Sequence, residues 1–171
     1  MSAVIRVIIV ALLLFMPSSS LASIEQALRI GIGTNPLPGE NGGQPAPVGA
    51  VFAFDIQWDG GLVAISPYAE YYSWSEESRT YTGAHALLTK DVTRGGVYGG
   101  LGVGVLRLRY SHDDSSSYAP TFDVVLGGRN TVSSSVALFG EGKLTFHRKW
   151  FPEDLDPIGE ILLSLGVVFA L

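Results

Sequence analysis

The residues best suited to catalysis or metal binding are few and scattered in this chain. Its three histidines, His85, His112 and His147, lie far apart among 171 residues, and cysteine is absent, whereas a metal centre needs several ligands at fixed spacing. The stretch SHDDSSS around His112 has the residue types of a cation site or a nucleophile, but its composition is that of a solvated loop. The nucleophile elbow, the phosphate-binding loop and the dinucleotide fingerprint are also absent. We therefore expect no enzyme activity, metal or cofactor.

The elements that carry these residues are predicted to be strands, because apolar side chains alternate with a period of two from Ala27 onward. Ordinary strands have about five or six residues, whereas a tilted strand that crosses a bilayer needs about nine to eleven. Most of the alternating runs have this greater length. The predicted strands are Ala27–Asn35, Val48–Asp59, Leu62–Trp74, Thr80–Val92, Val97–Ser111, Tyr118–Asn130, Val136–Lys149 and Ile158–Leu171.

The connections between these strands alternate between short and long. Asp59–Gly61 and Thr93–Gly96 read as tight turns, whereas TNPLPGENGGQPAP, WSEES, SHDDSSS and KWFPEDLDP are longer and polar. Asn130–Ser135 is an exception, since it is longer than a tight turn should be. Bacterial membrane barrels have short turns on the periplasmic side and longer loops outside. The alternation therefore predicts a meander of hairpins.

The two faces of most predicted strands differ in polarity, since neighbouring side chains point to opposite sides of a sheet. In the strand at 48–59, one face carries Phe52, Phe54 and Trp58, and the other carries Asp55 and Gln57. The last three predicted strands divide in the same way, whereas the faces of the strand at 80–92 stay unassigned. One surface of the sheet is therefore expected to be free of charge.

The charged faces predict a network inside a narrow barrel. An eight-stranded barrel has a bore that side chains can fill, and buried charges are costly unless they are paired. Five acidic and four basic side chains fall on these faces, and this near balance favours pairing over a channel lined by one sign of charge. They are Asp55, Glu70, Arg107, Arg109, Asp123, Arg129, Glu141, Lys143 and Glu160.

Aromatic residues are predicted to form girdles at the two membrane interfaces. One group falls near the ends of the strands that lead into the long connections, and a smaller group falls near the short turns. The first group is Tyr71, Tyr72, Trp74, Tyr81, Tyr110, Tyr118, Trp150 and Phe151, and the second is Trp58, Tyr98 and Phe169.

A soluble sandwich or lipocalin-like barrel is the alternative, with the uncharged faces as its core. The opposite faces are too apolar for that arrangement, because Val97, Leu101 and Val103 would then stand in water beside Arg107. Charged residues also make up only 16% of the chain, against about 25% in ordinary domains. A membrane barrel fits this composition better.

Residues 1–22 have the pattern of a secretory signal peptide. Arg6 precedes an apolar core that ends at Met16, and Ser20 and Ala22 provide the small residues for cleavage before Ser23. We therefore expect a single exported domain at 23–171, without disulfides because there is no cysteine. The net charge of −5 gives no basic surface for nucleic acid.

The last strand ends in an apolar run, LLSLGVVFAL, which must pair with the first strand if the barrel is closed. Its Ser164, Gly166, Phe169 and Leu171 resemble the C-terminal assembly signal of outer-membrane barrels, with Leu171 where Phe or Trp is usual. Together with the signal peptide, YAEYY and YGGLGVGVLRLRY, these residues make nearly the whole mature chain similar to the small OmpA/OmpX/opacity-type outer-membrane β-barrel family.

This resemblance implies an all-β fold, an eight-stranded antiparallel transmembrane β-barrel with an up-and-down meander, in a Gram-negative outer membrane. It implies outer-membrane lipid and the barrel assembly machinery as partners, and a monomer. We expect a structural or surface-interaction role carried by the extracellular loops. The alternatives are a narrow pore for small solutes and a lipid-modifying enzyme that uses His147, although HRKW replaces the His-x-Ser-Asn pattern of barrel lipid A deacylases.

Overall fold

The computed structural model describes residues 24–36, 46–58, 62–73, 77–112, 115–147 and 158–171. The predicted signal peptide at 1–22 lies outside this part of the chain. No helix among the described residues is long and apolar enough to cross a membrane.

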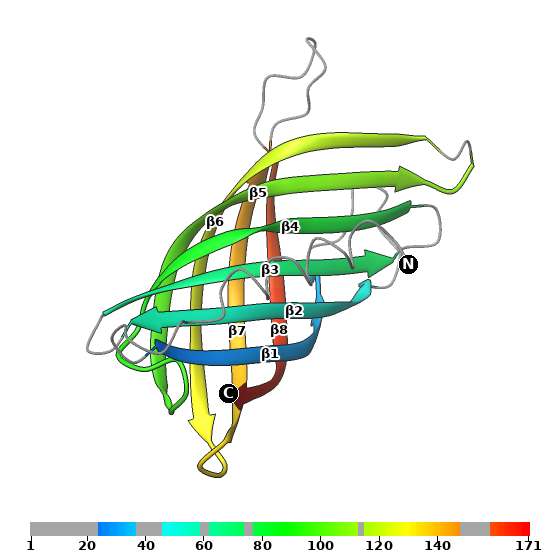
Figure 1. The fold of residues 1–171 in the computed structure, drawn as a ribbon. Helices are drawn as coiled ribbons and strands as arrows, with labels where there is room; N and C mark the ends of the chain where they lie inside the picture. Colours follow the sequence, from blue (N-terminus) through cyan, green and yellow to red (C-terminus); the bar gives the residue numbers. More distant parts are fainter. Residues whose placement is uncertain (1–23, 37–45, 59–61, 74–76, 113–114, 148–157) are drawn as a thin grey trace.

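Eight strands make up the described chain, and each corresponds to one of the predicted strands (Figure 1). They have between 11 and 16 residues, with β5 and β6 the longest. The strands are β1 (Ile24–Thr34), β2 (Val48–Trp58), β3 (Val63–Ser73), β4 (Glu77–Leu88), β5 (Gly96–Tyr110), β6 (Ser116–Thr131), β7 (Val136–His147) and β8 (Ile158–Ala170).

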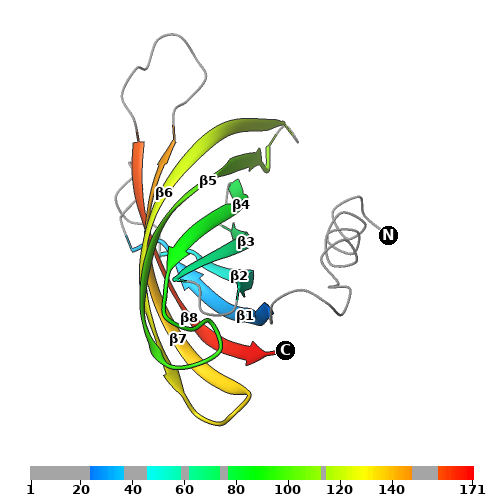
Figure 2. The same ribbon diagram turned by 60° about the vertical axis from the view of Figure 1, so that its left-hand side comes forward.

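The sheet is a closed antiparallel barrel in which each strand pairs with its neighbours in sequence (Figures 1 and 2). Closure comes from β8, which pairs with β1 from Ala27 opposite Ala170 to Thr34 opposite Leu163. The amide of Leu171 continues this ladder by donating to the carbonyl of Gln26 at 3.0 Å. The predicted up-and-down barrel is confirmed, and closure leaves no unpaired edge that would have to lie in lipid.

The connections β2–β3, β4–β5 and β6–β7 lie at one end of the barrel, which we call the turn end, and the remaining connections lie at the other, the loop end. At the turn end, β6 continues to Thr131, one residue further than predicted, and β7 begins at Val136 as predicted, so that only Val132–Ser135 connects them. The amides of Val132 and Ser133 both donate to the carbonyl of Val136, at 2.9 and 3.0 Å. The predicted exception to the short-turn rule is therefore an ordinary tight hairpin.

The β4–β5 connection differs from the prediction in the opposite sense. β4 ends at Leu88 rather than Val92, and the chain then forms a seven-residue connection, Thr89–Gly95, before β5 begins. Val92 is completely buried in this connection. The predicted tight turn at Thr93–Gly96 was wrong because Val92 belongs to the interior packing and not to the strand.

The two surfaces of the barrel differ as the alternation predicted. Large apolar side chains point outward around the sheet and are exposed, whereas the inward positions are buried. The outward set includes Ile32, Phe52, Ile65, Leu101, Val103, Phe122, Leu126, Leu138, Leu144, Leu165 and Phe169. An apolar belt of this kind is the lipid-facing surface of a membrane barrel.

Glycines on the inward faces make room for aromatic rings in the bore. A Cβ atom at Gly102 would lie 2.2 Å from Cδ2 of His85, and one at Gly127 would lie 2.4 Å from the ring of Tyr98. Any larger residue would push these rings out of place. The glycine-rich sequence of β5 and β6 therefore allows the narrow bore to hold large polar side chains.

Candidate functional site in the barrel interior

The structure places seven of the nine predicted interior charges inside the barrel. None of the seven is more than 7% exposed, and they come from β2, β3, β6, β7 and β8. They are Asp55, Glu70, Asp123, Arg129, Glu141, Lys143 and Glu160. Their contacts form three clusters, stacked along the bore from the turn end to the loop end.

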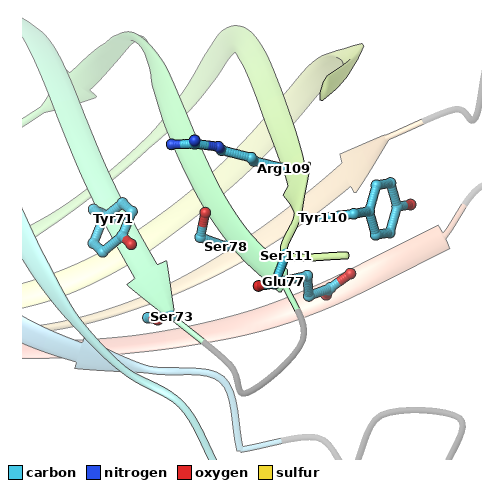
Figure 3. Close-up of a pocket in the computed structure, with 7 residues that line it drawn as sticks. All are labelled: Tyr71, Ser73, Glu77, Ser78, Arg109, Tyr110 and Ser111. Carbon is cyan, nitrogen blue, oxygen red and sulfur yellow. The ribbon is translucent and has the colours of Figure 1, made fainter. Parts of the chain in front are cut away.

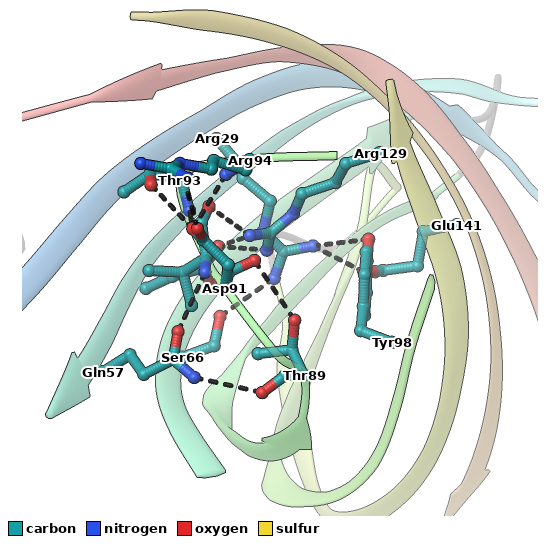
Figure 4. A network of polar contacts seen from close by, with 12 residues as sticks. Arg29, Gln57, Ser66, Thr89, Asp91, Thr93, Arg94, Tyr98, Arg129 and Glu141 are labelled. Atoms are coloured by element: carbon teal, nitrogen blue, oxygen red, sulfur yellow. Dashed lines mark hydrogen bonds and ion pairs between the residues drawn. The ribbon is translucent and has the colours of Figure 1, made fainter. Parts of the chain in front are cut away.

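The turn-end cluster is centred on Arg29 of β1, which is 1% exposed. Its guanidinium forms an ion pair with Glu141 (Figure 4). The guanidinium lies 3.1 Å from Oδ2 of Asp55. It also donates to the hydroxyl groups of Tyr98, at 3.2 Å, and Ser66, at 2.9 Å. One arginine therefore joins five strands across the bore.

A second arginine completes this cluster. Arg129 of β6 pairs with Oδ2 of Asp55 at 2.6 Å, and its guanidinium lies 4.8 Å from the centre of the Tyr98 ring. Two arginines therefore share the carboxylate of Asp55, and Glu141 accepts from both Arg29 and Tyr98. The two positive and two negative charges balance within the cluster, which is the condition under which buried charges are tolerated.

The β4–β5 connection packs against this cluster and closes the turn end of the bore. The side-chain amide of Gln57 donates to the carbonyl of Thr89 at 3.0 Å, and its oxygen accepts from the amide of Val92 at 2.9 Å. Arg129 also donates to the carbonyl of Val92. Interior side chains thus hold the connection in place, and Val92 is buried at the turn end of the bore.

Asp91 shapes the same connection by accepting three hydrogen bonds on Oδ1. The donors are the amide of Thr93 at 2.7 Å, its hydroxyl at 2.6 Å and the amide of Arg94 at 2.9 Å (Figure 4). Partial burial raises the pKa of Asp91, but these hydrogen bonds outweigh that effect and leave it below its ordinary value. The ionised carboxylate therefore stabilises the folded connection.

The middle cluster combines Lys143 of β7 with two carboxylates from other strands. Nζ of Lys143 lies 2.7 Å from Glu70 and 4.4 Å from the centre of the Tyr68 ring. Tyr68 donates to Asp123, which also lies 3.3 Å from Nε2 of His85. The rings of Tyr68 and His85 are stacked with their centres 4.2 Å apart.

The loop-end cluster is centred on Glu160 of β8. Arg79 and Tyr81 of β4 both donate to its carboxylate, and Nε2 of His147 lies 3.1 Å from it. Arg79 also pairs with Glu77 at 2.6 Å. Side chains of the three clusters therefore occupy the bore from the turn end to the first inward residues of β4, which lie at the loop end.

The predicted inward positions of Arg107 and Arg109 were wrong. In β5 the buried positions are Tyr98, Gly102 and Leu106, whereas Leu101 and Val103 are exposed, as are both arginines. A shift of one residue exchanges the two faces of a strand, and the glycines of β5 leave little contrast between them. Arg29 and Arg79 take the places of the two arginines, so the named inner set still holds five acidic and four basic side chains.

Three of the tyrosines predicted for the girdles also lie inside. Tyr72, Tyr81 and Tyr98 are no more than 2% exposed, whereas Tyr71 and Tyr118 point outward. Trp74, Trp150 and Phe151 lie outside the described residues. The inner tyrosines supply hydroxyl donors for buried carboxylates, a role that their spacing alone did not indicate.

Arg29 is the main interior residue that the sequence analysis missed. A signal was present, because Leu28, Ile30 and Ile32 alternate around it and assign Arg29 to the opposite face. Arg79 was missed because the predicted strand began at Thr80, whereas β4 begins at Glu77. His85 and His147 each contact a carboxylate in the bore, at 3.3 and 3.1 Å. Among the described residues, no group of acidic and histidine side chains has the arrangement of a metal site.

The residues of the predicted assembly signal lie in the part of β8 that closes the barrel. Gly166 faces Gly31 of β1, and a Cβ at Gly166 would lie 2.2 Å from the carbonyl oxygen of Ile30. Phe169 and Leu171 point outward and are exposed to lipid. Recognition of this pattern by an assembly machinery stays a prediction.

A closed eight-stranded meander with an apolar outer belt and a polar, filled bore defines the class of small outer-membrane β-barrels. This architecture places the protein in a bacterial outer membrane, where barrels of this class have their longer loops outside and their short turns in the periplasm.

Comparison with solved structures agrees with this class. Neisserial surface protein A superposes with a TM-score of 0.60 at 15% sequence identity, over 85% of this chain and 95% of the other. Ail of Yersinia pestis, in a complex with the heparin analogue sucrose octasulfate, also gives 0.60, at 12% identity over 87% and 99%. The N-terminal β-barrel domain of Pseudomonas aeruginosa OprF gives 0.53, at 10% identity over 88% and 98%. No family model matches the chain, and no curated protein matches its sequence.

Proposed function

We propose that this protein is a non-conducting outer-membrane barrel with a structural or surface-interaction role at its loop end. The observation that carries the proposal is the filled bore. Three clusters of paired charges occupy it, and the β4–β5 connection with Val92 covers its turn end. A barrel blocked in this way leaves the outer surface and the loops as the parts that can meet other molecules.

Electrostatics support a plug over a pore. A channel that selects ions with charged side chains carries rings of one sign along its path, whereas here each named basic side chain in the bore contacts at least one carboxylate. Moving an ion through the bore would require breaking these pairs, and each broken pair leaves an uncompensated buried charge.

The alternative of a lipid-modifying enzyme receives less support. Such an enzyme must present its catalytic groups to the lipid of the outer leaflet, but His85 and His147 point into the bore and are no more than 5% exposed. Each of them contacts a carboxylate that also accepts a tyrosine hydroxyl. This environment suits a structural hydrogen-bond network.

Conductance in planar lipid bilayers tests the plug directly. The unmodified protein should show little or no steady current, and Arg29→Ala should produce transient openings because it removes the centre of the turn-end cluster. Arg94→Ala is the matched control, because the Arg94 side chain also lies at the turn end but is 82% exposed. A large, stable and ion-selective current from the unmodified protein would overturn the proposal in favour of transport.

A surface role should depend on the longer connections at the loop end. Replacing residues 37–45 and 149–156 by short glycine–serine segments leaves all eight strands intact. Cells displaying the trimmed barrel should attach less to host-cell or matrix surfaces than cells displaying the intact protein at equal levels. Equal attachment would leave only the structural role.

We also propose that the assembly machinery recognises the outward pattern at the end of β8. Leu171→Asp should reduce the amount of assembled barrel, because it places a charge next to the closing strand pair, whereas Leu171→Phe should be tolerated or improve assembly. The measurement is the fraction of protein that migrates as the compact barrel on a gel without boiling. Unchanged assembly of Leu171→Asp would contradict this proposal.

A further inference from the structure

Asp123 of β6 differs from the other carboxylates of the three clusters. It is completely buried, and within the described strands His85 is the only basic side chain within ion-pair distance of it, at 3.3 Å. A buried carboxylate without a charged partner is costly, so its charge needs another source of compensation. The other carboxylates each pair with an arginine or a lysine, and they are Asp55, Glu70, Glu77, Glu141 and Glu160.

The imidazole ring of His85 is poorly placed to supply the missing positive charge. Its Nε2 atom lies 3.3 Å from Oδ2 of Asp123, whereas its Nδ1 atom is buried without a hydrogen-bond partner among the described residues. A protonated ring donates from both nitrogens, so it would place a second N–H group in the bore without an acceptor. A neutral ring that donates from Nε2 alone fits these contacts. His85 therefore satisfies one oxygen of Asp123 without cancelling its charge.

Three buried oxygen atoms around Asp123 have no hydrogen-bond partner within the described part of the chain. One is its own Oδ1, since Tyr68 donates to Oδ2. The others are the hydroxyls of Thr145, which stands directly opposite Asp123 on β7, and Thr121, which precedes it on the same face of β6. A Cβ atom at Gly104 would lie 3.0 Å from Oγ1 of Thr121 and 2.8 Å from the hydroxyl of Tyr68. The Thr121 hydroxyl therefore lies in the same part of the bore as the tyrosine that binds Asp123.

We propose that Asp123, Thr121 and Thr145 form a buried site for a monovalent alkali cation, Na⁺ or K⁺. Carboxylate and hydroxyl oxygens are the ligands that hard cations prefer. One carboxylate matches one positive charge, whereas a divalent cation would leave an excess. Water would satisfy the hydroxyl groups but would leave the charge of Asp123 uncompensated. A site of this kind uses oxygen ligands, so the spacing of the histidines in the sequence could not indicate it.

The proposed cation site lies deeper in the bore than the hollow at the loop end. That hollow is lined by residues of β3, β4 and β5, among them Glu77 and Tyr110 (Figure 3). Along β4, the contacts of Arg79 and Tyr81 with Glu160 separate the hollow from the cation site. A cation that enters from the loop end must therefore wait for these contacts to open. We expect slow exchange of a bound ion, and no steady passage of ions.

Unfolding of the full barrel in lipid vesicles tests the proposal. Urea titrations are compared in NaCl, in KCl and in choline chloride at the same ionic strength. The urea midpoint should be higher in Na⁺ or K⁺ and should rise with the concentration of that ion, because a ligand bound by the folded state alone shifts the unfolding equilibrium. Equal midpoints in all three salts would overturn the proposal and would leave ordered water as the occupant. This measurement is independent of conductance, so its failure is distinct from a failure of the proposed function.

Two variants assign the cation dependence to the site. Thr145→Val replaces the hydroxyl by a methyl group of similar size, and should raise about tenfold the cation concentration that gives half of the effect. Asp123→Asn should abolish the dependence. Thr82→Val is the matched control, because Thr82 lies on the outward face of β4 and is exposed, and this variant should keep the full dependence. A full dependence in Thr145→Val and Asp123→Asn would overturn the proposal, whatever the absolute stability of the two variants.

Binding of Tl⁺, which substitutes for K⁺ and is observed directly by NMR, provides a second measurement that does not rely on stability. The unmodified barrel should give a signal distinct from that of free Tl⁺, and an excess of KCl should displace it. Thr145→Val should weaken this signal, and Thr82→Val should not. Absence of a bound signal in the unmodified protein, or the same signal in Thr145→Val, would overturn the proposal.

Discussion

The inward and outward faces of the barrel use arginine in opposite ways. Arg29 is 1% exposed and contacts Glu141, Asp55, Tyr98 and Ser66. Arg107 lies in the half of β5 nearer the loop end and points outward, with a hydroxyl and a tyrosine ring as its neighbours. On the inner face carboxylates hold the arginine side chain, whereas on the outer face a hydroxyl group and a tyrosine ring contact it.

The largest effect is expected for Arg29→Met, which breaks the turn-end cluster. It leaves Glu141 and Asp55 buried with one fewer cation, and removing one partner of a buried ion pair typically costs about 3–5 kcal/mol. The measurement is the free energy of unfolding from urea titration in lipid vesicles, followed by the heat-modifiable gel shift. Arg94→Met is the matched control, with an expected change within about 0.5 kcal/mol. Equal stability of the two variants would show that the interior network contributes little.

The outward face should respond to charge according to depth. Val103→Arg places a cation near the middle of the apolar belt, where the cost is about 2–4 kcal/mol, whereas Ser73→Arg places one at the level of Arg109, where it is about 0–1 kcal/mol. Unfolding free energies of the two variants in the same vesicles provide the measurement. A similar cost at both positions would mean that the apolar belt extends further toward the loop end than the exposed Tyr71 and Tyr118 indicate.

The packing of rings against glycine should give a smaller effect. Gly102→Ala forces a Cβ into the position of the His85 ring, and overpacking of this kind costs about 1–3 kcal/mol. Gly140→Ala is the control, because its Cβ would meet nothing within 4 Å on the outward face. Unfolding measurements on both variants separate a steric effect from the general effect of replacing glycine in a strand. The comparison would fail if both alanines were equally tolerated.

The alternation of side chains along the strands predicted the fold and most of the interior charges. The assignment of faces was correct only in strands where one face carries large apolar side chains and the other does not. Asp123 and Glu141 were assigned correctly because large apolar residues, such as Phe122 and Leu144, occupy the opposite faces of their strands. In β5 the glycines removed this contrast, so the faces were exchanged and Arg107 was placed in the bore. The position of Val92 depends on contacts with Gln57 and Arg129 from distant strands, and no local pattern encodes such contacts.

The smallest effect concerns Asp91, which lies at the turn end outside the membrane-spanning strands. Its ionised carboxylate accepts hydrogen bonds from Thr93 and from the amide of Arg94, and its pKa is lower in the folded protein than its ordinary value. The stability that it contributes is therefore fully present above about pH 4, the ordinary carboxyl pKa, and is lost as the pH falls through the lower folded value. Asp91→Asn keeps an acceptor oxygen but removes the charge, so we expect a loss of about 0.5–1 kcal/mol at pH 7.

Unfolding free energies of the unmodified protein and of Asp91→Asn, measured at pH 7 and again near pH 3, check this expectation. The difference between the two proteins should shrink at the lower pH, because protonation makes the carboxyl resemble the amide. Hydrogen exchange at the amides of Thr93 and Arg94 should show the same trend, with the protection in the unmodified protein falling toward that of the variant. If the difference stayed constant with pH, the charge of Asp91 would not stabilise the connection, and Gln57 and Arg129 alone would hold Val92 at the end of the bore.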